Sequence, residues 1–132
     1  MFYGDFMNTV NRWIAQAQYD LDTPLAMLES KRHLYVIFCC QQAIEKAIKA
    51  VILQKTQKFP PRLHNLLRLA EIAEIEIEED TRTFPGELSA YYIQTRYPDE
   101  YEQIGKEIRD ESARKVFQKT KETVEWLTSI MK

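Results

Sequence analysis

Residues 41–50 read QQAIEKAIKA. Apolar residues in and just beyond this stretch recur at three- and four-residue steps, which is the spacing of one helical face: Ile44, Ile48 and Val51. The opposite face is polar and carries Gln42, Glu45, Lys46 and Lys49. The spaced charges favour a solvated face. The small residues Ala43, Ala47 and Ala50 favour a second interpretation, in which another helix approaches closely and part of this face is an inter-helix seam.

The stretch lies in the most apolar segment, residues 31–58, which contains neither Gly nor Pro. It predicts a long helix that Phe59-Pro60-Pro61 ends, because proline lacks a backbone donor and disfavours helical geometry in the residue before it. The apolar stripe of residues 7–29 predicts an earlier long helix, in which we expect a kink at Pro24.

Three further segments complete the chain. A short helix is expected from Leu63, and the alternating residues 74–78 are interpreted as its frayed end, because the chain offers no partner strand. Residues 83–86 read as a turn, residues 87–97 as a helix closed by Pro98, and residues 104–131 as a long closing helix. We therefore predict one all-α domain over residues 1–132, an antiparallel up-and-down bundle of about five helices.

Composition narrows the class of protein. The chain has 132 residues, of which 45% are hydrophobic and 29% charged, with 3 Gly and 5 Pro, a balance typical of one compact helical domain. The formal net charge of -2 means that any contact with nucleic acid must use a local patch. No stretch approaches the roughly 20 apolar residues of a membrane span. We expect a cytoplasmic protein that does not bind a membrane.

The two cysteines, Cys39 and Cys40, are adjacent within a helical pattern, which is poorly suited to a disulfide between them and indicates reduced thiols. The two histidines, His33 and His64, complete no recognised metal-ligand spacing. No metal and no cofactor are expected. His33 is interpreted as an ordinary surface residue.

Charge is segregated along the chain. Six cations occur with no acidic residue between them: Lys46, Lys49, Lys55, Lys58, Arg62 and Arg68. Six acidic residues follow: Glu71, Glu74, Glu76, Glu78, Glu79 and Asp80. This pattern predicts a basic and an acidic end of the bundle. It fits either simple solubility or an anion-binding surface near the second and third helices.

A third cluster surrounds an arginine with tyrosines where a helix is expected to end: Tyr91, Tyr92, Arg96, Tyr97 and Tyr101. Arginine can grip a phosphate bidentately and tyrosine rings can stack on bases. Alternatively, the tyrosines lie at the edge of the core and Arg96 pairs with Asp99.

Taken together, QQAIEKAIKA at residues 41–50, HNLL at residues 64–67 and RYPD at residues 96–99 resemble the HEPN domain family in order and spacing. The opening AQYDL at residues 17–21 is similar to that family's first helix. The resemblance implies an up-and-down helical bundle that dimerises and works beside a minimal nucleotidyltransferase in a toxin–antitoxin-like pair.

Many members of that family are metal-independent ribonucleases in which four to six residues separate an arginine from a following histidine. In that chemistry the arginine stabilises the phosphorane charge and the histidine is the acid or base. Here Tyr101 occupies the first position allowed to the histidine, and no histidine follows Arg96. Tyrosine, with an ordinary pKa of about 10, is a poor base near neutral pH. The departure argues against ribonuclease activity.

Three functions are carried forward. The first is a dimeric binding module for a nucleotide or a partner, and its expected residues are Gln42, Glu45, Lys46, Lys49, His64, Tyr92, Arg96, Tyr97 and Asp99. The second is an RNA endonuclease that uses Arg96 with Tyr101 or His64 as base. The third is a structural helical adaptor. The resemblance also allows Tyr101 to be a target of nucleotide transfer by the partner. His64 is expected to cap a helix or to hydrogen-bond around its loop.

Overall fold

The structure, a computed structural model, describes residues 2–30, 32–75 and 109–131. These ranges contain four helices, α1 (Phe2–Glu29), α2 (His33–Thr56), α3 (Leu66–Ile72) and α6 (Asp110–Ser129), and no strand. The all-α prediction is confirmed. The turn expected at residues 83–86, the helix expected at residues 87–97 and the first part of the closing helix expected at residues 104–108 lie outside the described residues.

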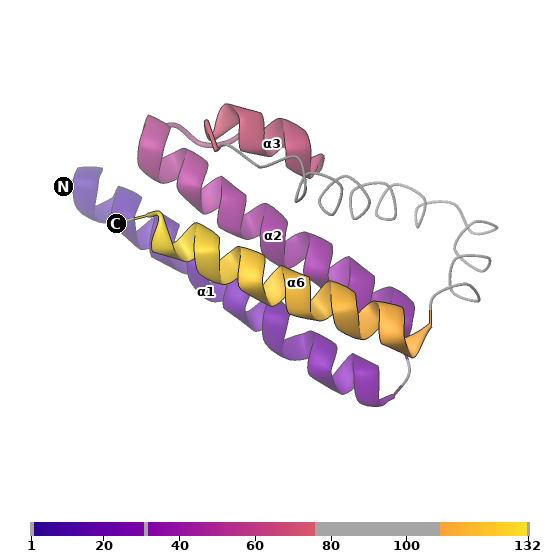
Figure 1. Cartoon of the computed structure of the whole chain (residues 1–132). Coiled ribbons are helices and arrows are strands. Elements are labelled where there is room, and N and C mark those ends of the chain that lie inside the picture. Colours follow the sequence, from indigo (N-terminus) through magenta and orange to yellow (C-terminus); the bar gives the residue numbers. More distant parts are fainter. Residues whose placement is uncertain (1, 31, 76–108, 132) are drawn as a thin grey trace.

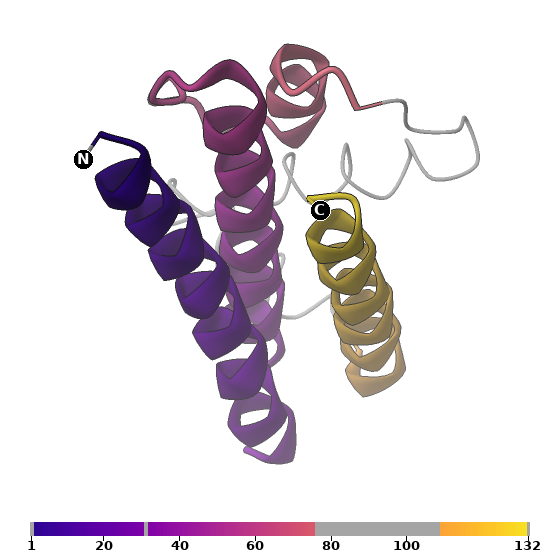
Figure 2. The same cartoon turned by 90° about the vertical axis from the view of Figure 1, so that its left-hand side faces the viewer.

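The central element is α2, which packs against α1, α6 and α3. The helices α1 and α2 form an antiparallel hairpin, α6 runs beside it, and the short α3 lies against α2 (Figures 1 and 2). Both chain termini lie at the end of the bundle from which the α2–α3 loop leaves (Figure 1). Thirteen residues of α2 are buried, which explains why this segment is the most apolar of the chain.

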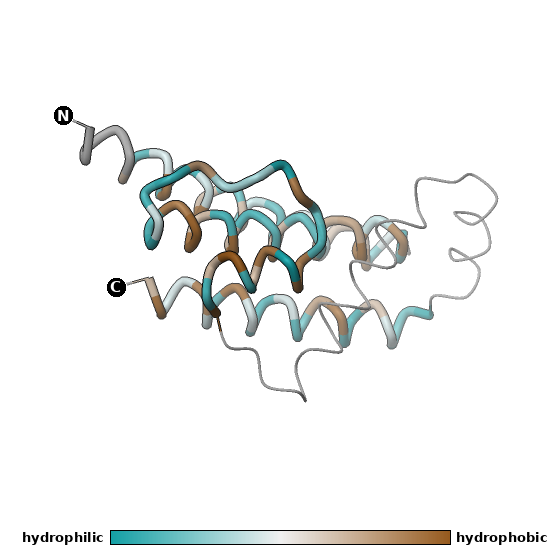
Figure 3. Tube along the Cα trace, turned by 90° about the horizontal axis from the view of Figure 1, so that it is seen from above, coloured by the Kyte–Doolittle hydropathy of each residue, from teal (hydrophilic) through white to brown (hydrophobic). Residues whose placement is uncertain are grey.

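The core joins apolar residues from all four helices. Ile44, Ile52 and Leu53 of α2 are fully buried together with Leu69 of α3 and Leu127 of α6. Along α6, hydrophobic and hydrophilic residues alternate with helical spacing (Figure 3), and the helix buries Ala113, Thr120, Val124 and Leu127. Within the described ranges, no helix combines the length and apolarity that crossing a membrane requires.

Helix α1 is continuous through the buried Pro24 and begins at Phe2, earlier than the expected residue 7. Just before the proline, the Thr23 hydroxyl donates to the Tyr19 carbonyl at 3.2 Å. Thr23 is therefore an internal residue of α1, and the helix does not stop and restart at the proline. At the other end, the Ser30 hydroxyl donates to the carbonyls of Ala26 and Met27 and helps to close α1.

Helix α2 ends before the prolines that were expected to end it. Its last residue is Thr56, and Gln57 adopts a left-handed conformation with φ 57° while its N–H donates to the Leu53 carbonyl at 2.9 Å. This is an αL C-cap, which satisfies a terminal carbonyl without any proline. The expected range of residues 31–58 was therefore too long by two residues at each end.

Helix α3 starts at Leu66 rather than at Leu63. Asn65 is its N-cap, because the Asn65 side-chain oxygen accepts a hydrogen bond from the Arg68 backbone N–H at 3.0 Å. The helix ends at Ile72, and the next residues turn, with Glu74 at φ 57°. The frayed end expected for residues 74–78 is thus a turn at residues 73–74, and residues 76–78 lie outside the described part. Helix α6 begins at Asp110 after the extended Arg109.

Candidate functional site

The polar residues of α2 gather around Glu45. One Glu45 carboxylate oxygen lies 2.8 Å from Nδ1 of His64, and the other lies 3.2 Å from Nζ of Lys49. His64 comes from the α2–α3 loop and its side chain is 42% exposed, whereas the Glu45 and Lys49 side chains are largely covered. The carboxylate therefore orients an imidazole at the surface, as expected for hydrogen bonding by His64 around its loop.

Gln41 completes this group, which we call the Glu45 network: Gln41, Glu45, Lys49 and His64. Gln41 is fully buried, with 0% exposure, and its amide nitrogen donates to the His64 backbone carbonyl at 2.8 Å. The loop is thus attached to α2 by both the backbone and the side chain of one residue. Gln41 was not among the predicted site residues, although Gln41, Glu45 and Lys49 follow one another at four-residue steps, which places the three on one helical face.

Lys46 connects α2 to α1. Its Nζ lies 2.7 Å from the Asp20 carboxylate, which is buried. Ala43, Ala47 and Ala50 are buried as well, which confirms the interpretation of this region as an inter-helix seam. The polar residues Gln42, Glu45, Lys46 and Lys49 are all half-buried, so the interpretation of a fully solvated face is wrong.

Gln42 differs from its neighbours. It is half-buried, and its side chain makes no hydrogen bond or ion pair within the part of the chain that the structure describes. The structure therefore brings together Glu45, Lys49 and His64 of the predicted site, with Lys46 in a separate ion pair. Tyr92, Arg96, Tyr97, Asp99 and Tyr101 lie outside the described residues.

Most of the predicted basic run is matched by internal partners. Lys46 and Lys49 pair with carboxylates, Arg68 pairs with Glu71 at 3.0 Å, and the ammonium group of Lys55 donates to the Ala73 carbonyl at 3.1 Å. Lys58 and Arg62 form no ion pair with the residues that the structure describes, and both are exposed. Within the described residues, the cations of this run that lack an internal partner are therefore both in the α2–α3 loop.

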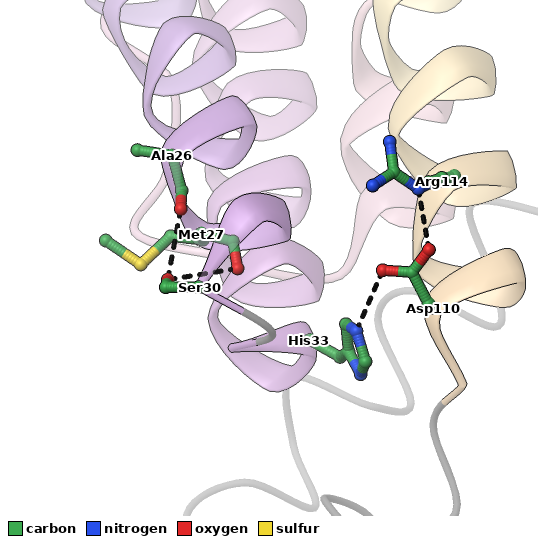
Figure 4. A network of polar contacts seen from close by, with 6 residues as sticks. All are labelled: Ala26, Met27, Ser30, His33, Asp110 and Arg114. Carbon is green, nitrogen blue, oxygen red and sulfur yellow. Dashed lines mark hydrogen bonds and ion pairs between the residues drawn. The ribbon is translucent and has the colours of Figure 1, made fainter.

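A second polar group joins the beginnings of α2 and α6. His33 Nε2 lies 3.2 Å from Asp110, and Arg114 Nε donates to the other Asp110 oxygen at 2.7 Å (Figure 4). The His33 side chain is only 15% exposed, so its interpretation as an ordinary surface residue is wrong. The Arg114 hydrogen bond, aided by His33, lowers the pKa of Asp110 below its ordinary value. His33 and Asp110 are 77 positions apart, so no local sequence pattern predicts their contact.

The cysteines are free thiols, as expected. Burial raises the pKa of Cys40 to about 12, although a hydrogen bond with Thr120 acts in the opposite direction. Burial and the Asp20 carboxylate also raise the pKa of Cys39, while Lys46 lowers it. Neither thiol is therefore activated as a nucleophile. Among the described residues, no group of three His, Cys, Asp or Glu side chains is arranged to hold a metal ion.

These features define a helical-bundle protein with a polar network that joins its central helix to the following loop. Residues 10–130 match the family model of the HEPN domain, so the chain belongs to the HEPN domain family, a family of nucleotide-binding and ribonuclease type. The resemblance identified in the sequence is thereby confirmed.

A solved structure supports the fold. The crystal structure of TT1696 from Thermus thermophilus aligns with a TM-score of 0.77 over 92% of this chain and 98% of that chain, at 22% sequence identity. The likeness at this identity concerns the fold. No curated protein matches the chain.

Proposed function

We propose that this protein is a dimeric HEPN-type binding module for a nucleotide or a partner protein, and that its partner is a minimal nucleotidyltransferase in a toxin–antitoxin-like pair. The observation that carries the proposal is the Glu45 network in a chain of this family: Glu45 holds the His64 imidazole at 2.8 Å and leaves its side chain 42% exposed. An oriented, accessible imidazole can hydrogen-bond to a phosphate, a ribose or a partner side chain.

The lysines have a supporting role in this proposal. Lys49 is matched by Glu45 and Lys46 by Asp20, so an incoming phosphate would have to compete with a carboxylate at either ammonium group. Phosphate contacts are therefore assigned first to His64 and to Arg96, whose guanidinium suits bidentate binding. Tyr92, Tyr97, Asp99 and Gln42 are proposed as further binding residues.

Binding tests this proposal directly. Calorimetric titration with ATP and co-purification with a nucleotidyltransferase encoded beside this chain are to be measured for wild type, His64→Ala and Arg96→Ala. Lys121→Ala is the matched control, because Lys121 is an exposed cation of α6 that is not part of the Glu45 network. We expect both site variants to weaken binding and the control to match wild type. A wild-type protein that neither binds ATP nor retains the nucleotidyltransferase would contradict the proposal.

The second candidate function is a metal-independent RNA endonuclease that uses Arg96, and one observation favours it. The Glu45 carboxylate fixes the orientation of the His64 ring, which is how a carboxylate prepares a histidine for acid–base work. RNA cleavage without added metal is the test, with Arg96→Ala, His64→Ala and Tyr101→Phe compared at equal folding. Cleavage that persists unchanged in Arg96→Ala would exclude this candidate.

A further inference from the structure

The α2–α3 loop, residues 57–65, exposes an aromatic side chain between two cations. The loop reads QKFPPRLHN, and Phe59 is 75% exposed, more than any other described large hydrophobic residue. Lys58 precedes Phe59 and Arg62 follows it by three residues, and both are exposed. Neither the core nor the Glu45 network explains why Phe59 is held in solvent.

The cations beside Phe59 have no acidic partner among the described residues. No acidic residue occurs from position 57 to position 70. Glu45, which contacts the loop through His64, also pairs with Lys49, and Glu71 pairs with Arg68. Among the described residues, Lys58 and Arg62 are the two cations of the basic run whose side chains have neither a carboxylate nor a carbonyl partner, since Lys55 donates to the Ala73 carbonyl. As far as the described residues go, the loop therefore presents positive charge without a matching carboxylate to an approaching ligand.

Hydrogen bonds and two prolines restrain the loop backbone. The Lys58 N–H donates to the Thr56 hydroxyl at 3.1 Å, and the Leu63 N–H donates to the Pro61 carbonyl at 2.8 Å. At its far end, Gln41 binds the His64 carbonyl. Pro60 and Pro61 restrict the backbone further. A loop ordered in advance loses little conformational entropy when it binds, which makes an exposed ring on it an effective contact.

We propose that the α2–α3 loop binds single-stranded nucleic acid, with Phe59 stacking on a base and Lys58 and Arg62 contacting the phosphates on either side. An aromatic platform flanked by cations is the arrangement that binds single strands with little sequence preference. Because this contact uses Phe59, Lys58 and Arg62 and no residue of the Glu45 network, it goes beyond the proposed function and does not require that a mononucleotide binds at His64.

Fluorescence anisotropy with a labelled oligouridylate of about 12 nucleotides, within the usual site size of a single-strand binder, tests the proposal. Stacking of one base is worth about 1–3 kcal/mol, so Phe59→Ala is expected to raise the Kd about tenfold. Each phosphate contact with a single strand contributes about 0.7 to the slope of log K against log salt. Replacing both Lys58 and Arg62 by Ala is therefore expected to reduce that slope by about 1.4.

Two controls separate the loop from the general surface. Tyr19→Ala removes another highly exposed aromatic, 72% exposed on α1, and Lys121→Ala removes an exposed cation of α6. Both are expected to bind the oligonucleotide as wild type does. Because all these side chains are exposed, melting curves that match wild type are expected to confirm intact folding.

Two results would overturn the proposal. The first is an unchanged Kd in Phe59→Ala together with an unchanged salt slope in the double variant. The second is unchanged oligonucleotide binding in Phe59→Ala with loss of a co-purified nucleotidyltransferase, which would assign the loop to a protein partner. ATP titration of the same variants keeps this test separate from the proposed function. Phe59→Ala is expected to have the same affinity for ATP as wild type.

Discussion

Gln41 and Gln42 are identical neighbours in sequence with different environments in the fold. Gln41 is fully buried and donates to the His64 carbonyl at 2.8 Å, whereas Gln42 is half-buried without a polar contact in the described part. The helical pattern places Gln42 on the polar face, so the sequence predicted Gln42 as a binding residue. The burial of Gln41 depends on where the α2–α3 loop returns, and that is a tertiary contact that no helical pattern contains.

This pair yields a matched experiment. Gln41→Leu preserves most of the buried volume but leaves the His64 carbonyl without its donor, so it is expected to lower the free energy of unfolding by about 1–2 kcal/mol. Gln42→Leu removes no such bond and is expected to change stability by less than about 0.5 kcal/mol. Urea unfolding monitored by circular dichroism measures both. Equal stabilities of the two variants would refute this role of Gln41.

At the scale of one element, the ends of the helices are where sequence and structure differ most. The existence of α1, α2 and α6 follows from their apolar stripes, since a stripe extends over many turns. Their ends depend on single residues instead. Two prolines suggested the end of α2, yet the helix stops at Thr56 because Gln57 takes the left-handed conformation. A glutamine carries no signal for that conformation, whereas a glycine would have marked it.

Gln57→Gly is therefore expected to stabilise the protein by about 1 kcal/mol, because glycine adopts φ 57° without the steric cost that a Cβ atom brings. Lys121→Gly, at an exposed position inside α6, is expected to destabilise it by about 1 kcal/mol. Thermal unfolding of both variants gives the comparison. A melting temperature that falls in Gln57→Gly would show that the left-handed cap is not strained.

The ion pair between Lys46 and Asp20 is the polar link within the α1–α2 seam. Lys46→Met retains the apolar stem but leaves the buried Asp20 carboxylate without its counter-charge, so it is expected to cost about 2 kcal/mol of stability. Asp20→Asn removes the buried charge itself and is expected to cost less. The free energies of unfolding of the two single variants and the double variant, measured by chemical denaturation, form a double-mutant cycle. If Asp20→Asn were the more damaging, Lys46 would not be serving as the counter-charge.

At the scale of the whole molecule, the bundle is closed by contacts between segments far apart in sequence. The all-α class and the order of the helices follow from composition and periodicity, whereas the contact of His33 with Asp110 spans 77 positions and appears only in the folded chain. The same limit applies to function. The segregated charges predicted a basic run, but the fold decides which of its cations have internal partners, and among the described residues it leaves Lys58 and Arg62 exposed without one.

The link between His33, Asp110 and Arg114 predicts how stability changes with pH. Because the pKa of Asp110 is lowered in the folded state, folding favours its carboxylate form. The stabilising contribution is complete above the ordinary aspartate pKa of about 3.9 and is lost as the pH falls through the lowered folded-state value. Asp110→Asn is therefore expected to melt at a lower temperature than wild type at neutral pH, and the difference is expected to shrink in acid.

Glu111→Gln is the control for this pH dependence. Glu111 lies in the same first turn of α6, but it is highly exposed, and its one ion pair among the described residues is with Lys115, four residues along the same helix, at 3.4 Å. Both variants lose one carboxylate near the helix N-terminus, so the helix dipole affects them alike. Only Asp110→Asn also loses the connection to α2. Melting curves are to be compared between neutral pH and about pH 3, below the ordinary aspartate pKa. Equal shifts for the two variants would reduce the role of Asp110 to the dipole. A larger neutral-pH effect for Asp110→Asn would assign the difference to the contacts of Asp110 with Arg114 and His33.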